Sequence, residues 1–273
     1  MAVRLEALLP SGSRPVAQST SLTTSLTNRD IHLWYLDRTS LSFLMPELAN
    51  VLSLDEQQRR DRFKFQKDRD RFVLGRGLLR CILGHYLSCA PETIQFCYGD
   101  RGKPSVSKPR WSGIQFSVSY SSDRILYGFS RSAIGVDIEA IKPHASGDEI
   151  LQRYFSSAIV EAIQGLPPER RGAEFLKVWT MMEAYLKGTG QGISSPFSTL
   201  DLSPNRRSPD WIVTPIPKTR WQTTHFTLGE YQAAIATRIH APVIMPVYGF
   251  PPGSPPAHPR SNEGTIPSTK RGD

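Results

Sequence analysis

Short apolar runs bounded by turn residues predict the β-strands of this chain. The run IHLWYL at residues 31–36 predicts a first strand, and FTLGEYQAAIATRI at residues 226–239 predicts two more strands. Between them, the runs at 114–120, 125–130 and 133–141 follow one another with turn residues at each break. This spacing predicts that the three runs form an antiparallel meander.

Helical spacing of apolar residues accounts for the stretches between these strands. Ser53 followed by Glu56 is a capping-box sequence, which predicts the start of a helix. A second helix is predicted over residues 67–87, and further helical segments run from 148 to 165 and from 169 to 187, where GTGQG follows as a stop signal. Because helices and strands come in clusters and not in strict βαβ alternation, the pattern predicts a mixed α/β fold of the α+β kind.

Composition separates a folded body from two polar ends. Residues 11–28 contain nine Ser or Thr and residues 242–273 contain eight prolines, so neither end can bury a core. We expect a disordered leader at 1–29, in preference to a transit peptide, and a disordered Pro-rich tail at 241–273. The chain has 273 residues, 39% of them hydrophobic, which is enough for one large domain or two small ones. No apolar run is long enough to span a membrane.

Charge and cysteine content narrow the class of protein. The net charge of +8 favours an acidic partner, a polyphosphate ligand or nucleic acid, and does not distinguish among them. Cys81, Cys89 and Cys97 form no CxxC pair, which indicates ordinary thiols in a reduced, cytoplasmic protein.

Two acidic residues stand out in the sequence GVDIE at residues 135–139. If this run is a strand, Asp137 and Glu139 point to the same face, because side chains alternate along a strand. Two carboxylates on one face repel each other, and burial strengthens the repulsion, so the pair calls for a cation. The simpler alternative is a strand that enters a solvated edge.

A second constellation lies in FLKVWTMMEAYLKGTG. Trp179, Glu183 and Lys187 fall at i, i+4 and i+8 and share one helix face, where a surface Glu–Lys pair is the simpler alternative. Together with Asp137 and Glu139, Glu183 makes a set of oxygen ligands suited to Mg²⁺, which takes its remaining ligands from water and substrate phosphates. Basic residues upstream would hold those phosphates: Arg59, Arg62, Lys67, Arg71, Arg76, Arg101 and Lys103. The residues therefore indicate metal-assisted transfer from a polyphosphate.

These stretches resemble a known paired signature. IGVDIE at 134–139 and WTMMEAYLK at 179–187 are similar to (V/I)G(I/V)D(I/L)E and W(S/T)xKEAxxK of the surfactin-type 4′-phosphopantetheinyl transferases. In the same order, residues 63–87 look like the early helix of that family, RGKP at 101–104 like its conserved loop, and FSVSYS at 116–121 like its F-N-x-S-H-S strand. Five ordered matches are far more specific than any one of them.

The resemblance covers about residues 30–240 and implies a fold. The family has a pseudo-twofold pair of similar α/β halves with coenzyme A in the cleft between them. This places an N-terminal half at 30–133 and a C-terminal half with the metal site at 134–240, in a monomer. It implies an enzyme that transfers 4′-phosphopantetheine from coenzyme A to a serine of an acyl, peptidyl or polyketide carrier protein, with Mg²⁺, and releases 3′,5′-ADP.

The resemblance also assigns roles to residues. Asp137, Glu139 and Glu183 fall on the family's Mg²⁺ ligands. Glu183 falls on the residue that deprotonates the carrier serine, and Lys187 on the lysine that neutralises phosphate or leaving-group charge. The positions where the family grips coenzyme A are Arg59, Arg101, Gly102, Lys103, Pro104, Ser119 and Tyr120.

Three departures from the family pattern bear on activity. Met182 replaces the signature lysine, Tyr120 replaces the histidine of F-N-x-S-H-S, and Ser117 replaces its asparagine. Neither Met nor Tyr can supply a cation near neutral pH. We expect an active enzyme that Met182→Lys would accelerate, and the alternative is an impaired member that still binds coenzyme A or carrier protein. A basic nucleic-acid-binding protein is disfavoured, because acidic residues interrupt the basic run and no known binding motif surrounds it.

Overall fold

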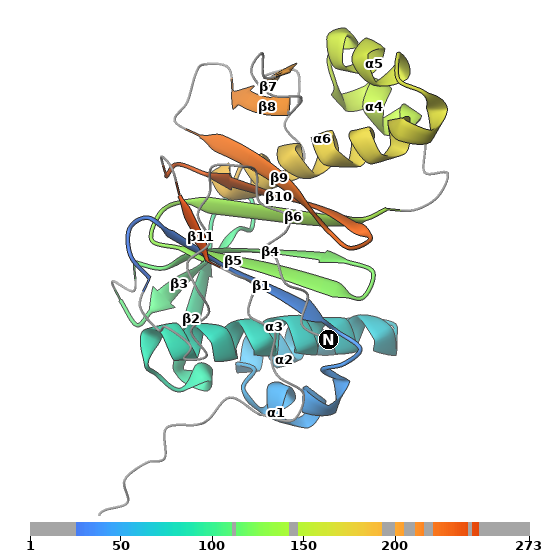
Figure 1. Cartoon of the computed structure of the whole chain (residues 1–273). Helices are drawn as coiled ribbons and strands as arrows, with labels where there is room; N and C mark the ends of the chain where they lie inside the picture. The colour runs from blue at the N-terminus through green and yellow to red at the C-terminus, as the bar shows by residue number, and fades with distance from the viewer. Residues whose placement is uncertain are drawn as a thin grey trace, which may run out of the picture.

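The computed structural model describes residues 26–110, 113–141, 147–192, 200–204, 211–215, 221–239 and 242–245. In this part of the chain two β-sheets lie face to face, and each is covered on its outer side by helices (Figure 1). The resulting order of layers is helix, sheet, sheet, helix. Most of the predicted leader and tail, residues 1–25 and 246–273, lies outside the described residues.

The first half builds the lower helix and sheet layers of Figure 1. Its helices follow the first strand, and its remaining strands follow the helices. The elements are β1 (Asp30–Asp37), α1 (Met45–Asn50), α2 (Leu54–Asp61), α3 (Gln66–Leu87), β2 (Gln95–Tyr98), β3 (Pro104–Lys108), β4 (Gln115–Ser121) and β5 (Arg124–Ser130).

The second half repeats this sequence of elements. They are β6 (Ile134–Ala140), α4 (Asp148–Tyr154), α5 (Ser157–Gln164), α6 (Pro168–Thr189), β7 (Leu200–Pro204), β8 (Trp211–Pro215), β9 (Gln222–Leu228) and β10 (Tyr231–Thr237). A last short strand, β11 (Val243–Met245), returns to the first half and pairs with β1 in parallel.

The two sheets have the same internal topology. In the first sheet the order is β11-β1-β5-β4, and in the second it is β6-β10-β9. In each, the first strand of the half pairs with the last, and the last pairs with the one before it, always antiparallel. Small hairpins occupy corresponding places, β2–β3 and β7–β8. The expected pair of similar α/β halves is therefore confirmed, although the sequence itself shows no repeat.

Three apolar clusters fill the spaces between the four layers. The first lies between the helices of the first half and the first sheet, with Leu79 and Phe129 among its members. The second lies between the two sheets and contains Ile31, Val136 and Ile235. The third lies between the second sheet and α4 to α6. Strands buried on both faces explain the nearly continuous apolar runs of the sequence.

Helix signals predicted from the sequence are borne out. The capping box places the Ser53 amide 3.1 Å from Glu56 Oε2 at the start of α2. Helix α6 ends at Thr189 and is followed by Gly190, whose φ of 77° is left-handed, as the GTGQG stop signal predicts. None of the helices in the described part of the chain has the length and apolar character that crossing a membrane requires.

The predicted three-stranded meander is only partly right. β4 and β5 are antiparallel neighbours, but β6 pairs with β10, so that Asp137 lies opposite Ala234. β6 thus starts the second sheet and does not extend the first. The local alternation that predicts a strand carries no information about a partner nearly a hundred residues later.

Candidate active site

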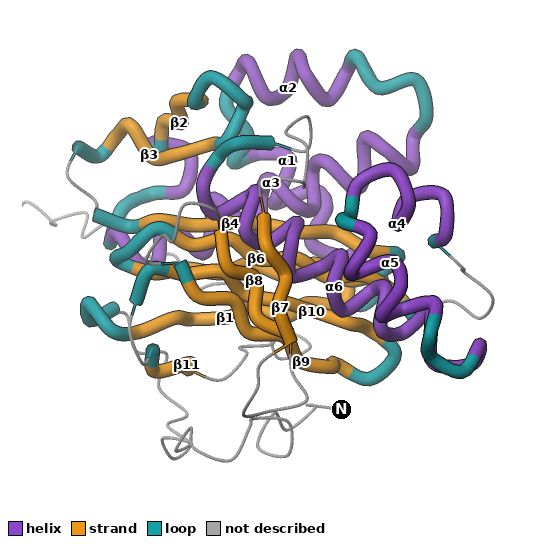
Figure 2. Tube along the Cα trace, turned by 90° about the horizontal axis from the view of Figure 1, so that it is seen from above, coloured by secondary structure: helices purple, strands orange, loops and turns teal. Residues whose placement is uncertain are grey.

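Gly135 determines how closely α6 lies on β6. A Cβ at this position would overlap the Ala184 carbonyl oxygen and the Gly188 amide of α6. Helix α6 packs on the second sheet, against β6 and β10, and α4 and α5 lie on the same side of that sheet (Figure 2). The close approach brings the acidic face of β6 up to the helix face that carries Glu183 and Lys187.

Asp137 and Lys187 meet at this contact. Lys187 Nζ lies 2.6 Å from Asp137 Oδ1 and 2.9 Å from Ser119 Oγ, and Ser119 Oγ donates to the same Asp137 oxygen at 2.7 Å. Asp137 is 2% exposed, and its Oδ2 has no hydrogen-bond partner in the described residues. Burial raises the pKa of Asp137, and the Lys187 ammonium opposes that rise.

Glu183 is the second buried carboxylate of the cluster. It is 4% exposed, and its Oε1 has no hydrogen-bond partner in the described residues. Burial raises its pKa to about 7, and the charges of Asp137 and Glu139 add to the rise while Lys187 opposes it. A carboxyl group with a pKa near 7 can take up a proton at physiological pH.

A row of serines on β4 joins the two halves beside this cluster. Ser117 Oγ accepts the Val136 amide at 3.1 Å, and Ser121 Oγ accepts the Ala140 amide at 2.9 Å. Ser121 Oγ also donates to Glu139 Oε2 at 2.9 Å. Because Ser119 binds Asp137, every second residue of β4 from 117 to 121 bonds to β6. Side chains therefore replace a backbone ladder between the neighbouring strands of the two sheets.

A hollow of about 340 Å³ opens at the carboxylate cluster. Glu183 and Lys187 line it from the second half, together with the glycines that follow α6. The first half contributes Ser117 and the loop residues Arg101, Gly102, Lys103 and Pro104.

Lys103 ties this loop to the second half. Its Nζ donates to the carbonyl oxygens of Gly188 at 2.7 Å and Ile134 at 3.2 Å. Burial lowers the pKa of Lys103 to about 8. In this structure the side chain thus links the two halves.

A second hollow, of about 460 Å³, adjoins the first. The two share Gly102, Pro104 and Val118 in their walls. The second hollow is lined mainly by α3 and by arginines and aromatic rings of the first half. Its polar and aromatic lining includes Arg59, Phe63, Asp68, Arg71, Phe72, Arg76, Tyr98 and Tyr120.

Comparison with known proteins decides the family. Residues 133–236 match the family model of the 4′-phosphopantetheinyl transferase superfamily, and residues 41–127 match that of the 4′-phosphopantetheinyl transferase N-terminal region. The 4′-phosphopantetheinyl transferase HetI of a Nostoc species is 37% identical over 172 residues, which is 62% of this chain and 73% of that protein. The chain belongs to the 4′-phosphopantetheinyl transferase superfamily.

More distant relatives agree with this membership. The transferase Sfp of Bacillus subtilis is 25% identical over 168 residues, 62% of this chain and 73% of its own length. A phosphopantetheinyl transferase of a Thraustochytrium species is 31% identical over 154 residues, 52% of this chain and 54% of its own length. The chain is thus an enzyme that transfers phosphopantetheine, in a family that uses coenzyme A and acts on carrier proteins.

The donor set of the transferase fits a magnesium ion. Among the described residues, no group of three His, Cys, Asp or Glu side chains is placed so that it could hold a metal ion by itself. Mg²⁺ does not need such a group, because it keeps several waters and is bound by one or two carboxylates together with substrate phosphates. The unpartnered buried oxygens of Asp137 and Glu183 are hard ligands of that kind.

The structure gathers the sequence-predicted residues around β4, β6, α6 and the loop before β3. Arg59 and Tyr120 line the larger hollow and not the smaller one. Trp179 packs against the rings of Phe155 and Phe175, as expected for a core residue. Sequence reasoning gave no role to Ser121, although the alternating serines of SVSYS were a visible signal.

Met182 is fully buried in the apolar cluster of the second half. The expectation that Met182→Lys accelerates transfer is therefore abandoned, because the position faces the core and not the cluster of Asp137 and Glu183.

Proposed function

We propose that this transferase moves 4′-phosphopantetheine from coenzyme A to a serine hydroxyl of a carrier protein, with Mg²⁺, and releases 3′,5′-ADP. The observation that carries the proposal is the pair of buried carboxylates, Asp137 and Glu183, beside Lys187, where Glu183 and Lys187 line a hollow between the two halves. Buried like charges with unpartnered oxygens are costly unless a ligand completes them. A metal-bound pyrophosphate would do so.

In this proposal Asp137, Glu139 and Glu183 would hold the ion, with water and pyrophosphate oxygens as its remaining ligands. When bound, Mg²⁺ supplies Lewis-acid stabilisation of pyrophosphate oxygens. Ser119 and Ser121 fix the orientation of Asp137 and Glu139 through hydrogen bonds of 2.7 and 2.9 Å. Such supporting bonds hold carboxylate ligands in place before the substrate arrives.

Glu183 and Lys187 handle the proton and the charge. The carrier serine oxygen forms a bond to the phosphorus that bears pantetheine, and the bond from that phosphorus to the ADP oxygen breaks. Glu183, with a pKa near 7, receives the serine proton directly or through water. Lys187 neutralises the charge that develops on the departing phosphate.

Coenzyme A would extend through the two adjoining hollows. The smaller one, with Arg101 to Pro104, Glu183 and Lys187, suits the pyrophosphate and pantetheine. The larger one, with Arg59 and Tyr120 in its lining, suits the nucleotide. Lys103 contributes by fixing the loop against Gly188, and Ser119 by holding Asp137 and Lys187 together.

We propose a cytoplasmic monomer with halves at about 30–133 and 134–240. One chain suffices for the site in this proposal, because the second half supplies the acidic cluster and the first half supplies the loop and the larger hollow. The charge of +8 suits a carrier protein that is acidic around its serine. Binding should then weaken as salt is added.

Intact-protein mass spectrometry tests this function. An apo carrier protein is incubated with enzyme, coenzyme A and either Mg²⁺ or a chelator. We expect the mass to rise by one phosphopantetheine group on a serine only when Mg²⁺ is present. Equal modification in the chelator would reject the metal requirement, and modification at another residue type would reject the serine acceptor.

A further inference from the structure

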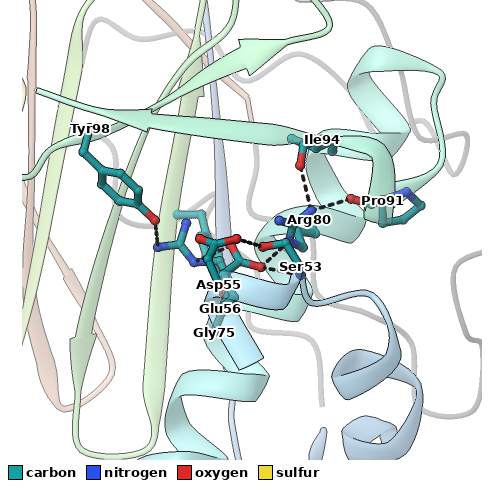
Figure 3. Close-up of polar contacts among 10 residues, drawn as sticks. Ser53, Asp55, Glu56, Gly75, Arg80, Pro91, Ile94 and Tyr98 are labelled. Carbon is teal, nitrogen blue, oxygen red and sulfur yellow. Dashed lines mark hydrogen bonds and ion pairs between the residues drawn. The ribbon is translucent and has the colours of Figure 1, made fainter. Parts of the chain in front are cut away.

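Arg76 is a cation held rigidly at the wall of the larger hollow. Its side chain is 11% exposed, and its Nε lies 3.4 Å from Glu56 Oε1. Its guanidinium carbon lies 4.8 Å from the centre of the Phe96 ring. Its Nη2 donates to the Tyr98 hydroxyl at 3.4 Å, the contact drawn at Tyr98 in Figure 3. Its Nη1 is buried and has no hydrogen-bond partner in the described residues. A rigid guanidinium with an unused donor is a ready site for an oxyanion.

Glu56 is what holds Arg76 in place, and it is shared with a second arginine. Glu56 Oε2 accepts Arg80 Nε at 2.6 Å, and Arg80 also donates to the carbonyl oxygens of Pro91 and Ile94 at 2.9 Å (Figure 3). Because Arg80 is fully buried and lies closer to Glu56 than Arg76 does, the Glu56 carboxylate mainly compensates the charge of Arg80. One carboxylate between two arginines leaves a positive charge on the side of Arg76. A buried excess charge is costly unless an anion completes it.

Arg76 does not stand alone in this wall. Arg59 lies over the Phe72 ring at 5.5 Å and Arg71 over the Tyr120 ring at 5.1 Å, so aromatic faces also support both of these guanidinium groups. The one acidic group among the lining residues described is Asp68. Three arginines against one aspartate make the hollow positive.

Tyr120, which replaces the histidine of the family pattern F-N-x-S-H-S, lies among these three arginines. Burial raises the pKa of the Tyr120 phenol, while the charges of Arg76, Arg71 and Arg59 lower it. The phenol stays neutral near pH 7, so it cannot replace the charge of the histidine that the family pattern has here. The nearby guanidinium groups can replace it.

We propose that Arg76, positioned by Glu56, binds the 3′-phosphate of coenzyme A and sets the preference of this enzyme for coenzyme A over dephospho-coenzyme A. The proposal rests on the function proposed above. Coenzyme A carries its anions at the pyrophosphate and at the ribose 3′ position. The smaller hollow with Glu183 and Lys187 takes the first, so the arginine-lined hollow that adjoins it takes the second.

The test compares the two co-substrates in wild type and variants. Initial rates of carrier modification are measured with coenzyme A and with dephospho-coenzyme A, which lacks only the 3′-phosphate. Arg76→Met removes the cation, Arg76→Lys keeps the charge without the planar fork, and Glu56→Gln loosens the support. Arg60→Gln is the matched control, because Arg60 neighbours Arg59, pairs with Asp61 at 2.7 Å and does not line the hollow.

For Arg76→Met we expect kcat/KM with coenzyme A to fall about tenfold or more, as for the loss of a charge-assisted hydrogen bond. The fall should appear in KM with little change in kcat, because the 3′-phosphate is remote from the reacting phosphorus. With dephospho-coenzyme A the change should stay within about twofold. Arg76→Lys and Glu56→Gln should give smaller losses that are again confined to coenzyme A, and Arg60→Gln should resemble wild type.

Equal losses with both co-substrates in a folded Arg76→Met or Arg76→Lys protein would overturn the proposal, because they would show a purely structural role. A wild-type enzyme that uses both co-substrates equally well would overturn it too. Neither result would touch the proposed function, which fails only if wild type does not modify the carrier with coenzyme A at all.

Discussion

Lys187 Nζ lies 2.6 Å from Oδ1 of Asp137, across the contact between α6 and β6. The two residues are 50 positions apart in the chain, and Ser119 of the other half bonds to both. One strand of the first sheet and two elements of the second half thus meet at a single charged contact. The cation that the crowded carboxylates require is partly supplied by the protein itself.

Removing that cation should destabilise the metal-free enzyme. Lys187→Met leaves Asp137 and Glu183 buried together without their positive neighbour, and we expect a loss of about 1–3 kcal/mol at pH 8 in chelator. Urea unfolding measures it. Lys177→Met on the same helix is the control, since Lys177 pairs with Glu174 at 3.5 Å away from the cluster. A stability change no larger than the control's would show that Lys187 does not compensate the carboxylates.

Glu183 should make stability fall as pH rises. Its pKa is raised from 4.5 to about 7, so between these values the unfolded chain loses the proton first and the folded state becomes relatively less stable. Glu183→Gln has no such proton to lose. In chelator we expect the variant to match wild type near pH 4.5 and to be more stable by on the order of 1–3 kcal/mol above pH 7. A difference that is independent of pH would contradict the raised pKa.

Met182→Lys should destabilise the protein and bring no gain in transfer. Met182 is fully enclosed in the apolar cluster of α6, and an ammonium there has no partner. We expect a loss of about 3 kcal/mol or more in the free energy of unfolding. Met182→Leu, which keeps size and polarity, should cost less than about 1.5 kcal/mol. A stable Met182→Lys protein with faster transfer would restore the interpretation based on the family lysine.

Gly135→Ala should move α6, with Glu183 and Lys187, away from Asp137 on β6. The added methyl group would meet backbone atoms of Ala184 and Gly188, which cannot move independently of α6. We expect a loss of about 2–4 kcal/mol, as for overpacking a tight core, and a fall in kcat as Glu183 shifts from Asp137. Gly229→Ala, in the β9–β10 turn, is the contrasting variant: nothing lies near its Cβ, so any loss of stability there comes from its left-handed φ of 58° and should leave kcat unchanged. Wild-type kcat in Gly135→Ala would argue against this geometry.

The ends of the folded body differ slightly from the boundaries expected from composition. Leu26 is 4% exposed within the first apolar cluster, and Val243–Met245 pair with β1. A chain of residues 26–245 should therefore keep the melting temperature and turnover of the full chain. A chain cut to 30–240 should melt at a lower temperature. Loss of folding in the longer of the two would show that residues outside it contribute to the core.

Much of the fold follows from local sequence. Ser53 and Glu56 mark the start of α2 because a capping box is local chemistry, and Asp137 and Glu139 share a side because strands have a period of two. The pairing of β6 with β10 does not follow, since alternation identifies a strand and not its partner. The sequence does not reveal the repeated topology of the two halves either. Corresponding layers need apolar residues of suitable size, and these need not be the same residues in both halves.

The site, too, has features that local sequence predicts and features that it does not. Spacing on α6 correctly places Glu183 and Lys187 on one face, but one residue earlier the helix turns by about 100°, which takes Met182 into the core. The bond from Lys103 to Gly188 and the sharing of Glu56 by Arg76 and Arg80 join distant segments. Contacts of this kind depend on the packing of α2, α3 and α6 and leave no periodic signal in the sequence.

The central claim is that the carboxylate cluster where α6 meets β6 is the active site. It is tested most directly by carrier modification with Asp137→Asn, followed by mass spectrometry at saturating coenzyme A and Mg²⁺. Asp123→Asn serves as the control, because Asp123 pairs with Arg38 on the surface. We predict that Asp137→Asn lowers kcat by about a hundredfold or more while its melting temperature stays close to that of wild type, and that Asp123→Asn transfers normally. Wild-type turnover by a folded Asp137→Asn enzyme would contradict the account.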